Sequence, residues 1–201
     1  RDRGMHFIYL LPYSTTEALV ESTLFSTELV DEEFYSTSIE SYLKEHCKVE
    51  EFSITHQEKG VIPLGKLAPH DAKIPGLGSN AGATRPASGY AFLFIQRQID
   101  AGIRLANSGK SITFKNPHRR IDLWMDLIFL TVLKHWPEHG PNMFVRMGKA
   151  LSGDQFVKFM SGDAGWWIRL KVIFAMPKWP FIKALSKHIL PTRKTTNAAV
   201  A

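Results

Sequence analysis

The period of the hydrophobic pattern changes along this 201-residue chain, and the change limits the folds available to it. The runs "MHFIYLLP" and "TEALVESTLFS" read as strands, and the short link between them predicts an antiparallel pair. From residue 118 onward, apolar residues recur at helical spacing in a series of short runs. Strands followed by helices are typical of the α+β class, with a β-rich segment at 1–75 and a helical region at 111–190.

The remaining segments refine this division. Residues 48–65 contain two more strand-like runs, broken at Gly60 and Pro63, and the acidic residues 31–33 open a helical pattern. Residues 76–110 join a glycine-rich loop to a long helix that ends before Gly109. The apolar stripe of this helix is predicted to contain Ala91, Phe94, Ile95, Ile99, Ile103 and Ala106. We expect residues 191–201 to be a disordered tail.

Charge and cysteine content indicate which binding partners and which cellular compartment suit the chain. Residues 1–60 carry a net charge of −7 and residues 61–201 a net charge of +13, so the second part favours an anionic partner. Aromatic residues are not interleaved with these basic residues in a single-strand binding pattern, so we expect no nucleic acid. The single cysteine, Cys47, permits no internal disulfide and indicates a reducing, cytosolic setting. No apolar run approaches the roughly 20 residues that span a bilayer.

The run "GWWIRLKVIFAMPKWPF" has two interpretations. Its three tryptophans are mixed with Arg169, Lys171 and Lys178. Aromatic and cationic residues together are typical of a helix at a membrane interface. They are equally compatible with a core helix whose basic side chains reach out to solvent.

The strand "ALVESTLF" carries a carboxylate in its middle. Alternation places Leu19, Glu21, Thr23 and Phe25 on one face. Either this face is solvated, or the glutamate is present for its acidity. In the second case, burial beside Leu19 and Phe25 would keep the carboxyl protonated near neutral pH.

The loop "GLGSNAGATRPASGY" is the most distinctive stretch. Its glycines, at 76, 78, 82 and 89, permit sharp turns or the close approach of a ligand. Pro86 is predicted in the first turn of the long helix, and Arg85 would add charge near that helix N-terminus. A tight loop with a helix cap would account for the same residues. His135 and His139 have a metal-like spacing, but Pro137 lies between them, so we expect no metal site.

Three of these stretches together resemble the C-terminal half of flavin-dependent lycopene cyclases: "FIYLLPYSTTEALVESTLFS", "EKGVIPLG" and "GSNAGATRPASGYAF". The resemblance extends over about residues 5–190. It implies a fold related to flavin-dependent hydroxylases, with a Rossmann-type part that binds FAD, a sheet that roofs the substrate cavity, and helices that complete it. The implied reaction converts the linear ψ-ends of lycopene into β-type rings.

The resemblance also implies roles for particular residues. Glu21 matches the essential proton donor, and Glu58 is a second acid–base candidate. The substrate cavity would be lined by Tyr9, Leu19, Thr23 and Phe25. Reduced FAD, with NAD(P)H as its reductant, would lie against Gly78, Ala81, Gly82, Arg85, Pro86, Gly89 and Tyr90. Aromatic faces stabilise cations, so Tyr9, Phe25 and Tyr90 are candidates to stabilise cationic intermediates; each of them also fits a core position.

Two departures from the family are evident. Where many members carry two acids before the threonine, this chain has Glu21 followed by Ser22, so a role for a second acid there is in doubt. The Gly-x-Gly-x-x-Gly turn for the ADP half of FAD is absent from these residues. Because the chain also opens without methionine, we expect that segment to precede residue 1, and we expect no cyclisation by this chain alone.

Alternatives remain at this stage. A flavin monooxygenase of the same fold, acting on a lipid, needs no proton donor on the strand. A non-catalytic carotenoid- or lipid-binding protein needs no flavin. For the cyclase, we expect a cytoplasmic protein that is peripheral to the inner face of a membrane, because its substrate is dissolved there.

Overall fold

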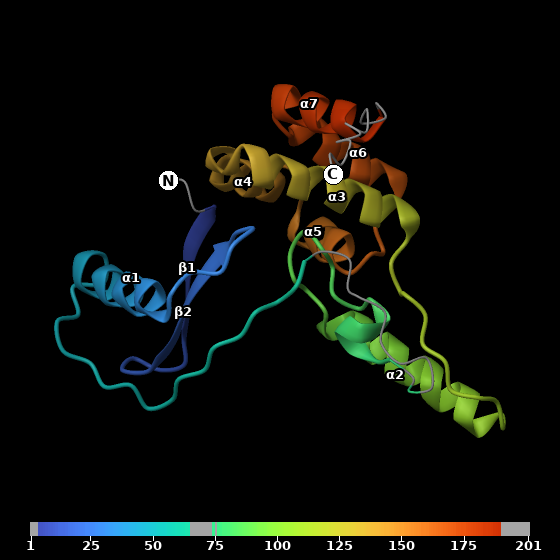
Figure 1. Ribbon diagram of the computed structural model, residues 1–201, viewed down its shortest axis with the longest axis horizontal. Helices are drawn as coiled ribbons and strands as arrows, with labels where there is room; N and C mark the ends of the chain where they lie inside the picture. Colours follow the sequence, from blue (N-terminus) through green and yellow to red (C-terminus); the bar gives the residue numbers. More distant parts are fainter. Residues whose placement is uncertain (1–3, 65–73, 75, 190–201) are drawn as a thin grey trace, which may run out of the picture. The chain divides into compact units, whose positions relative to one another are not determined.

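The computed structural model describes residues 4–64, 74 and 76–189. Across these residues the fold is α+β and mostly helical, as the change of hydrophobic period predicts, with seven α-helices and one two-stranded sheet (Figure 1). The tail predicted at 191–201 lies outside the described residues.

The chain divides into two compact units. One comprises residues 1–62 with 133–141, and the other comprises residues 63–132 with 142–201.

The first unit is built around a β-hairpin. Strands β1 (Met5–Pro12) and β2 (Ala18–Phe25) pair in antiparallel fashion, with Met5 opposite Phe25. The link closes where the backbone N–H groups of Tyr13 and Ser14 both donate to the Glu17 carbonyl. The predicted pair of strands is therefore confirmed.

Helix α1 (Glu32–Glu45) covers one face of this hairpin (Figure 1). Its first turn contains two acidic residues, whose negative charge stabilises the N-terminus of a helix. The two strand-like runs expected in residues 48–65 are wrong, because residues 48–64 form no strand. A strand needs a neighbour for its backbone hydrogen bonds, and β1 and β2 pair with each other rather than with this segment.

Helix α2 (Phe92–Asn107) follows the glycine-rich loop. It ends as predicted: Gly109 has φ +68°, its N–H donates to the Ala106 carbonyl, and the Lys110 N–H donates to the Leu105 carbonyl. The predicted start is wrong, since Pro86 lies before the helix in a turn and not in its first turn.

The buried side of α2 also differs from the predicted stripe. Its fully buried residues are Phe94, Gln98 and Gly102, whereas Ile103 is 54% exposed. Gln98 takes an inward position because its amide bonds to the backbone of neighbouring segments. Gly102 is required because the Phe114 ring lies so close that a Cβ at this position would be 2.8 Å from it.

The helices predicted after residue 118 are all present. In chain order they are α3 (Arg120–His135), α4 (Gly140–Ala150), α5 (Gly153–Met160), α6 (Trp166–Ala175) and α7 (Lys178–Ile189). A short 3₁₀ helix that was not predicted, η2 (Pro137–His139), lies between α3 and α4. Pro137 ends the longest of these patterns as predicted. Ser152 and Gln155 form a capping box that starts α5.

Helix α3 carries two buried acids one turn apart, each paired with an arginine. Asp122 accepts two hydrogen bonds of 2.9 Å from Arg169 of α6, and Asp126 lies 3.1 Å from the Nε of Arg85. Because all four residues are at most 4% exposed, these buried pairs attach α6 and the glycine-rich loop to α3. Within the described part of the chain, no helix combines the length and the hydrophobicity needed to cross a membrane.

Candidate functional site

The face of the hairpin that carries Glu21 is apolar. The register places Tyr9 opposite Glu21 and Leu11 opposite Leu19. Thr23 and Phe25 continue the same face. The structure thus brings together the five residues predicted for this part of the site, with the glutamate in the middle.

This face is open to solvent in the described chain. Tyr9 is 50% exposed and Leu19 is 39% exposed, and Glu21 is exposed as well. The expectation that Leu19 and Phe25 bury the carboxyl is therefore wrong for this chain by itself. Helix α1 covers one face of the two-stranded sheet. On the other face Met5 is buried at one end, next to Gly140, whereas the middle around Glu21 is exposed.

Glu21 is nevertheless held in a defined position. The hydroxyl of Thr23 donates to its Oε1 at 2.7 Å. Residues two apart on a strand point to the same face, so this bond follows from the local sequence. It occupies one carboxyl oxygen and leaves Oε2 as the atom able to carry and release a proton.

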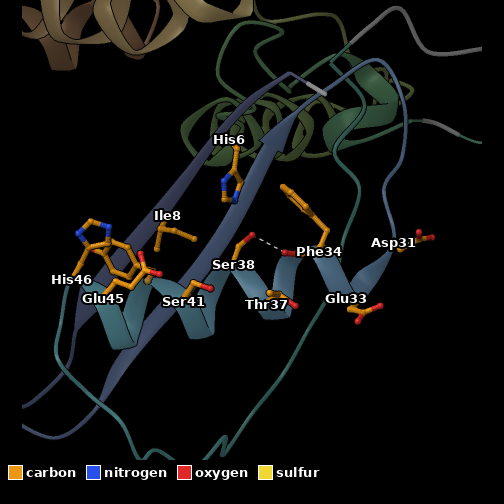
Figure 2. A pocket seen from close by; sticks show the side chains of 11 residues that line it. His6, Ile8, Asp31, Glu33, Phe34, Thr37, Ser38, Ser41, Glu45 and His46 are labelled. Atoms are coloured by element: carbon orange, nitrogen blue, oxygen red, sulfur yellow. Dashed lines mark hydrogen bonds between the residues drawn. The ribbon is translucent and has the colours of Figure 1, made fainter. Parts of the chain in front are cut away.

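The opposite face of the hairpin forms a separate hollow against α1. It has a volume of about 630 Å³ and opens widely to solvent. Figure 2 shows His6 and Ile8 of β1 on one side, with Phe34 and Ser38 of α1 on the other. His6 donates to or accepts from the Ser22 hydroxyl at 2.9 Å, and burial lowers its pKa. Because side chains alternate along β1, this hollow is not the surface that carries Glu21.

The glycine-rich loop lies in the other unit and forms a compact scaffold. It contains the short helix η1 (Gly78–Ala81), which Gly82 ends with φ +74°. A side chain at Gly82 would collide with Asn116, since a Cβ there would lie 2.6 Å from its amide nitrogen. Gly89, with φ +70°, closes the next turn by donating its N–H to the Arg85 carbonyl.

Gln98 is the residue of this site that sequence reasoning missed. Its side-chain oxygen accepts from the Gly78 N–H at 3.0 Å, and its amide nitrogen donates to the carbonyls of Ala81 and Lys115. It thereby fixes η1 against α2. Its position in the sequence could have revealed this role. Gln98 lies one turn after Phe94 and one turn before Gly102, on the same face of the helix, and a buried side-chain amide needs hydrogen-bond partners.

Arg85 has a different role from the predicted one. Its guanidinium pairs with Asp126, donates to the carbonyls of Phe159 and Met160, and lies 4.7 Å from the Phe159 ring centre. With 2% exposure it points into the protein. The expectation that Arg85 adds free charge to the loop is therefore corrected: it anchors the loop to α3 and α5.

Two titratable groups lie beneath this loop. Burial lowers the pKa of His118, whose Nε2 is 3.0 Å from the Ala83 carbonyl and whose ring meets Phe94 edge-on. Burial raises the pKa of Asp126, although Arg85 beside it acts in the opposite direction. A neutral His118 fits this partly buried position as a donor to the Ala83 carbonyl.

The loop offers parts of a site for an electron-rich group. Ala81, Gly82 and Gly89 are partly exposed, and the N-terminus of α2 has no side-chain cap. Uncapped N–H groups at a helix start attract negative charge. Tyr90, 36% exposed, offers an aromatic edge there. Arg85 does not contribute, as described above.

The second predicted acid lies elsewhere. Glu58 is exposed in the segment that follows α1, and its described contact is with His56 at 3.9 Å. The structure does not bring it to the apolar face of the hairpin. Among the described residues, no three His, Cys, Asp or Glu side chains gather in a way that could hold a metal ion.

Comparison with known proteins gives one match. A family described as "Lycopene cyclase protein" matches residues 1–186, which is nearly the whole chain. No curated protein and no solved structure matches it.

Proposed function

The chain belongs to the lycopene cyclase protein family, and on this premise we propose that it closes the linear ψ-ends of lycopene into β-type rings. The observation that carries the proposal is the hairpin face on which Glu21 stands opposite Tyr9 among apolar side chains. A polyene is apolar along its whole length, so an open apolar face with one acid at its centre is complementary to it.

Ring closure needs a proton at an unactivated double bond. In the proposed reaction, Oε2 of Glu21 donates this proton, and a carbocation forms. The neighbouring double bond attacks the cation and closes the ring, and a ring carbon then returns a proton to the Glu21 carboxylate, which restores the acid. One proton is gained and one is lost, so the product is an isomer of the substrate.

The surroundings of Glu21 support the donation step. When a polyene covers the face it displaces water from the carboxyl, which favours the protonated form. Thr23 holds the other oxygen. The ring of Tyr9 lies opposite Glu21 on the neighbouring strand, and its electron density would stabilise a cation that forms over this face.

Reduced FAD, with NAD(P)H as its reductant, is part of the same proposal. The residues that would hold its ring lie in the glycine-rich loop and directly after it: Ala81, Gly82, Pro86, Gly89 and Tyr90. Gly78, which was also expected there, is buried, and its N–H donates to Gln98. When bound, the reduced flavin would supply negative charge and would undergo no net redox change. The uncapped start of α2 would favour that negative charge through its free N–H groups.

The proposal also places the protein at a membrane. Lycopene dissolves in lipid, so an enzyme without a described membrane-crossing helix would collect it as a peripheral protein on the cytoplasmic side. This location is tested separately from the chemistry.

The chemistry is tested by pigment analysis in lycopene-accumulating cells that express the complete protein. Glu21→Gln removes the proton donor and keeps the shape, so we expect ring formation to fall by about 10²-fold or more. Glu28→Gln, an exposed glutamate beyond the strand, is the matched control and should behave as wild type.

Three results are informative. Cyclic carotenoids at wild-type levels in Glu21→Gln would overturn the proposed acid. The same loss in Glu58→Gln would assign the second acid a role. Oxygenated rather than cyclic products from the wild type would instead indicate a flavin monooxygenase.

A further inference from the structure

Helix α6 presents an apolar stripe to solvent. Five large residues form it, four of them aromatic or β-branched, and Trp167 and Phe174 are 69% and 71% exposed. At about 100° per residue, the five fall within an arc of roughly 120°. The stripe consists of Trp166, Trp167, Leu170, Ile173 and Phe174.

The orientation of α6 is set by its opposite face. There Arg169 is 2% exposed, donates to both carboxylate oxygens of Asp122 at 2.9 Å, and also donates to the Ala164 carbonyl. Val172 is buried beside it. A helix that turns an arginine inward and two tryptophans outward is inverted relative to an ordinary surface helix, and the buried ion pair holds it that way.

Helix α7 extends the stripe and adds positive charge. Trp179 is 66% exposed and Ile182 is 57% exposed. Lys178 donates to the Ile173 and Phe174 carbonyls and lies 5.1 Å from the Phe174 ring centre, and Lys183 lies 4.5 Å from the Trp179 ring centre. The lysine contacts make one continuous aromatic and cationic surface, which we call the α6–α7 surface.

The charged residues along α6 and α7 have a single sign. Residues 164–189 contain five lysines and arginines and no aspartate or glutamate. One of the five, Arg169, is neutralised by its buried partner. Exposed apolar patches of this kind mark interaction sites, and the surrounding charge selects an anionic partner.

We propose that the α6–α7 surface docks on a bilayer that contains anionic lipid. The α6 stripe enters the interface with its axis parallel to the membrane, and Lys178 and Lys183 lie at the headgroups. Spanning is excluded for α6, because its 10 residues extend about 15 Å and the hydrocarbon core is about 30 Å thick. The proposal specifies the membrane partner of the proposed cyclase, but its observations do not depend on catalysis.

The apolar stripe and the lysines should contribute to membrane binding in different ways, and this difference can be tested. The stripe should bind any fluid bilayer through buried apolar area, whereas the lysines should act only on anionic surfaces and should be screened by salt. The measurement is co-sedimentation of the full chain with vesicles of phosphatidylcholine, and with vesicles that also contain phosphatidylglycerol.

Two variants separate these contributions. In Trp167→Ser/Phe174→Ser, we expect binding to both kinds of vesicle to fall by about tenfold or more. In Lys178→Gln/Lys183→Gln, we expect binding to the anionic vesicles to fall by about tenfold, with weak binding to neutral vesicles unchanged. Val157→Ser and Lys149→Gln, at exposed positions on other helices, are the matched controls.

Several results would overturn the proposal. Absence of wild-type binding to anionic vesicles is one, and an equal loss in the controls is another. Light scattering supplies a third: if Trp167→Ser/Phe174→Ser converts a dimer into a monomer, the surface binds a second copy instead. Circular dichroism confirms that each variant keeps its fold. None of these readouts involves ring formation, so they remain valid if Glu21→Gln shows that the proposed chemistry is wrong.

Discussion

The two regions of the molecule differ in what they bury. The helical region buries charge: Arg85, Asp122, Asp126 and Arg169 are each at most 4% exposed, and each has an oppositely charged partner. In the hairpin region, Met5 is buried at one end of the face that carries Glu21, whereas Tyr9 in the middle of this face is 50% exposed.

This difference shows which region has side chains available for catalysis or binding. Buried ion pairs leave no free group for chemistry, because every polar atom is already used. An apolar face that stays in contact with water does not contribute to stability, and such a face is typical of a binding surface. The acid of the proposed reaction therefore stands in the less protected region, and the arginine that sequence reasoning assigned to a ligand belongs to the better protected one.

The largest expected change in stability comes from removing one partner of a buried ion pair in the helical region. Arg85→Met leaves Asp126 buried without its partner, so we expect the free energy of unfolding to fall by about 3–5 kcal/mol. Chemical denaturation followed by circular dichroism measures it. The double variant Arg85→Met/Asp126→Leu removes both charges and should recover much of the loss. A single-variant loss below about 1 kcal/mol would contradict the inward role of Arg85.

The next effect compares apolar side chains in the two regions. Met143 is 0% exposed, and Met143→Ala should lower the free energy of unfolding by about 2–5 kcal/mol because it leaves a cavity. Leu11 is 40% exposed on the open hairpin face, and Leu11→Ala should change it by about 0.5 kcal/mol or less. Similar losses in both variants would show that the hairpin face is covered.

A smaller effect is expected from the titration of His118. Since burial lowers its pKa in the folded state, the unfolded chain binds the proton more strongly, and stability should decrease as the pH falls below 6.5. His118→Gln retains a donor for the Ala83 carbonyl and removes the titration. Its denaturation midpoint should therefore depend less on pH between about 8 and 5 than that of the wild type. Identical pH profiles would contradict a buried, neutral histidine.

The smallest effect is expected from an exposed ion pair in the helical region. Arg97 lies 2.6 Å from Asp163, but the two side chains are 39% and 51% exposed. Arg97→Ala should lower the free energy of unfolding by about 0.2–1 kcal/mol, because solvent screens the pair.

The same pair also makes a prediction for pH. Burial acts to raise the pKa of Asp163, but the hydrogen bonds from Arg97 and Ser161 outweigh it, so the pKa lies below its usual value. Its contribution to stability should be present above pH 3.8 and be lost as the pH falls through the lowered pKa. An acid limb that is unchanged in Asp163→Asn would contradict this.

The sequence by itself determined the elements whose signals are local. Period-two and period-3.6 patterns, Pro137 and Gly109 located the hairpin, the helices and two of their ends, because these depend on neighbouring residues. Alternation along β2 likewise placed Leu19, Glu21, Thr23 and Phe25 on one face. Residues 48–64 failed as strands because pairing depends on a distant partner.

The tertiary structure decided which side chains are buried and with what. Arg85 finds Asp126 41 positions away and Arg169 finds Asp122 47 positions away, and no local pattern encodes such pairs. The ion pair of Arg169 also fixes the rotation of α6, and so turns Trp167 outward, where sequence reasoning left a core and an interface helix both open. Burial is a property of distant residues meeting in space, and for that reason it could not be read from the order of the residues alone.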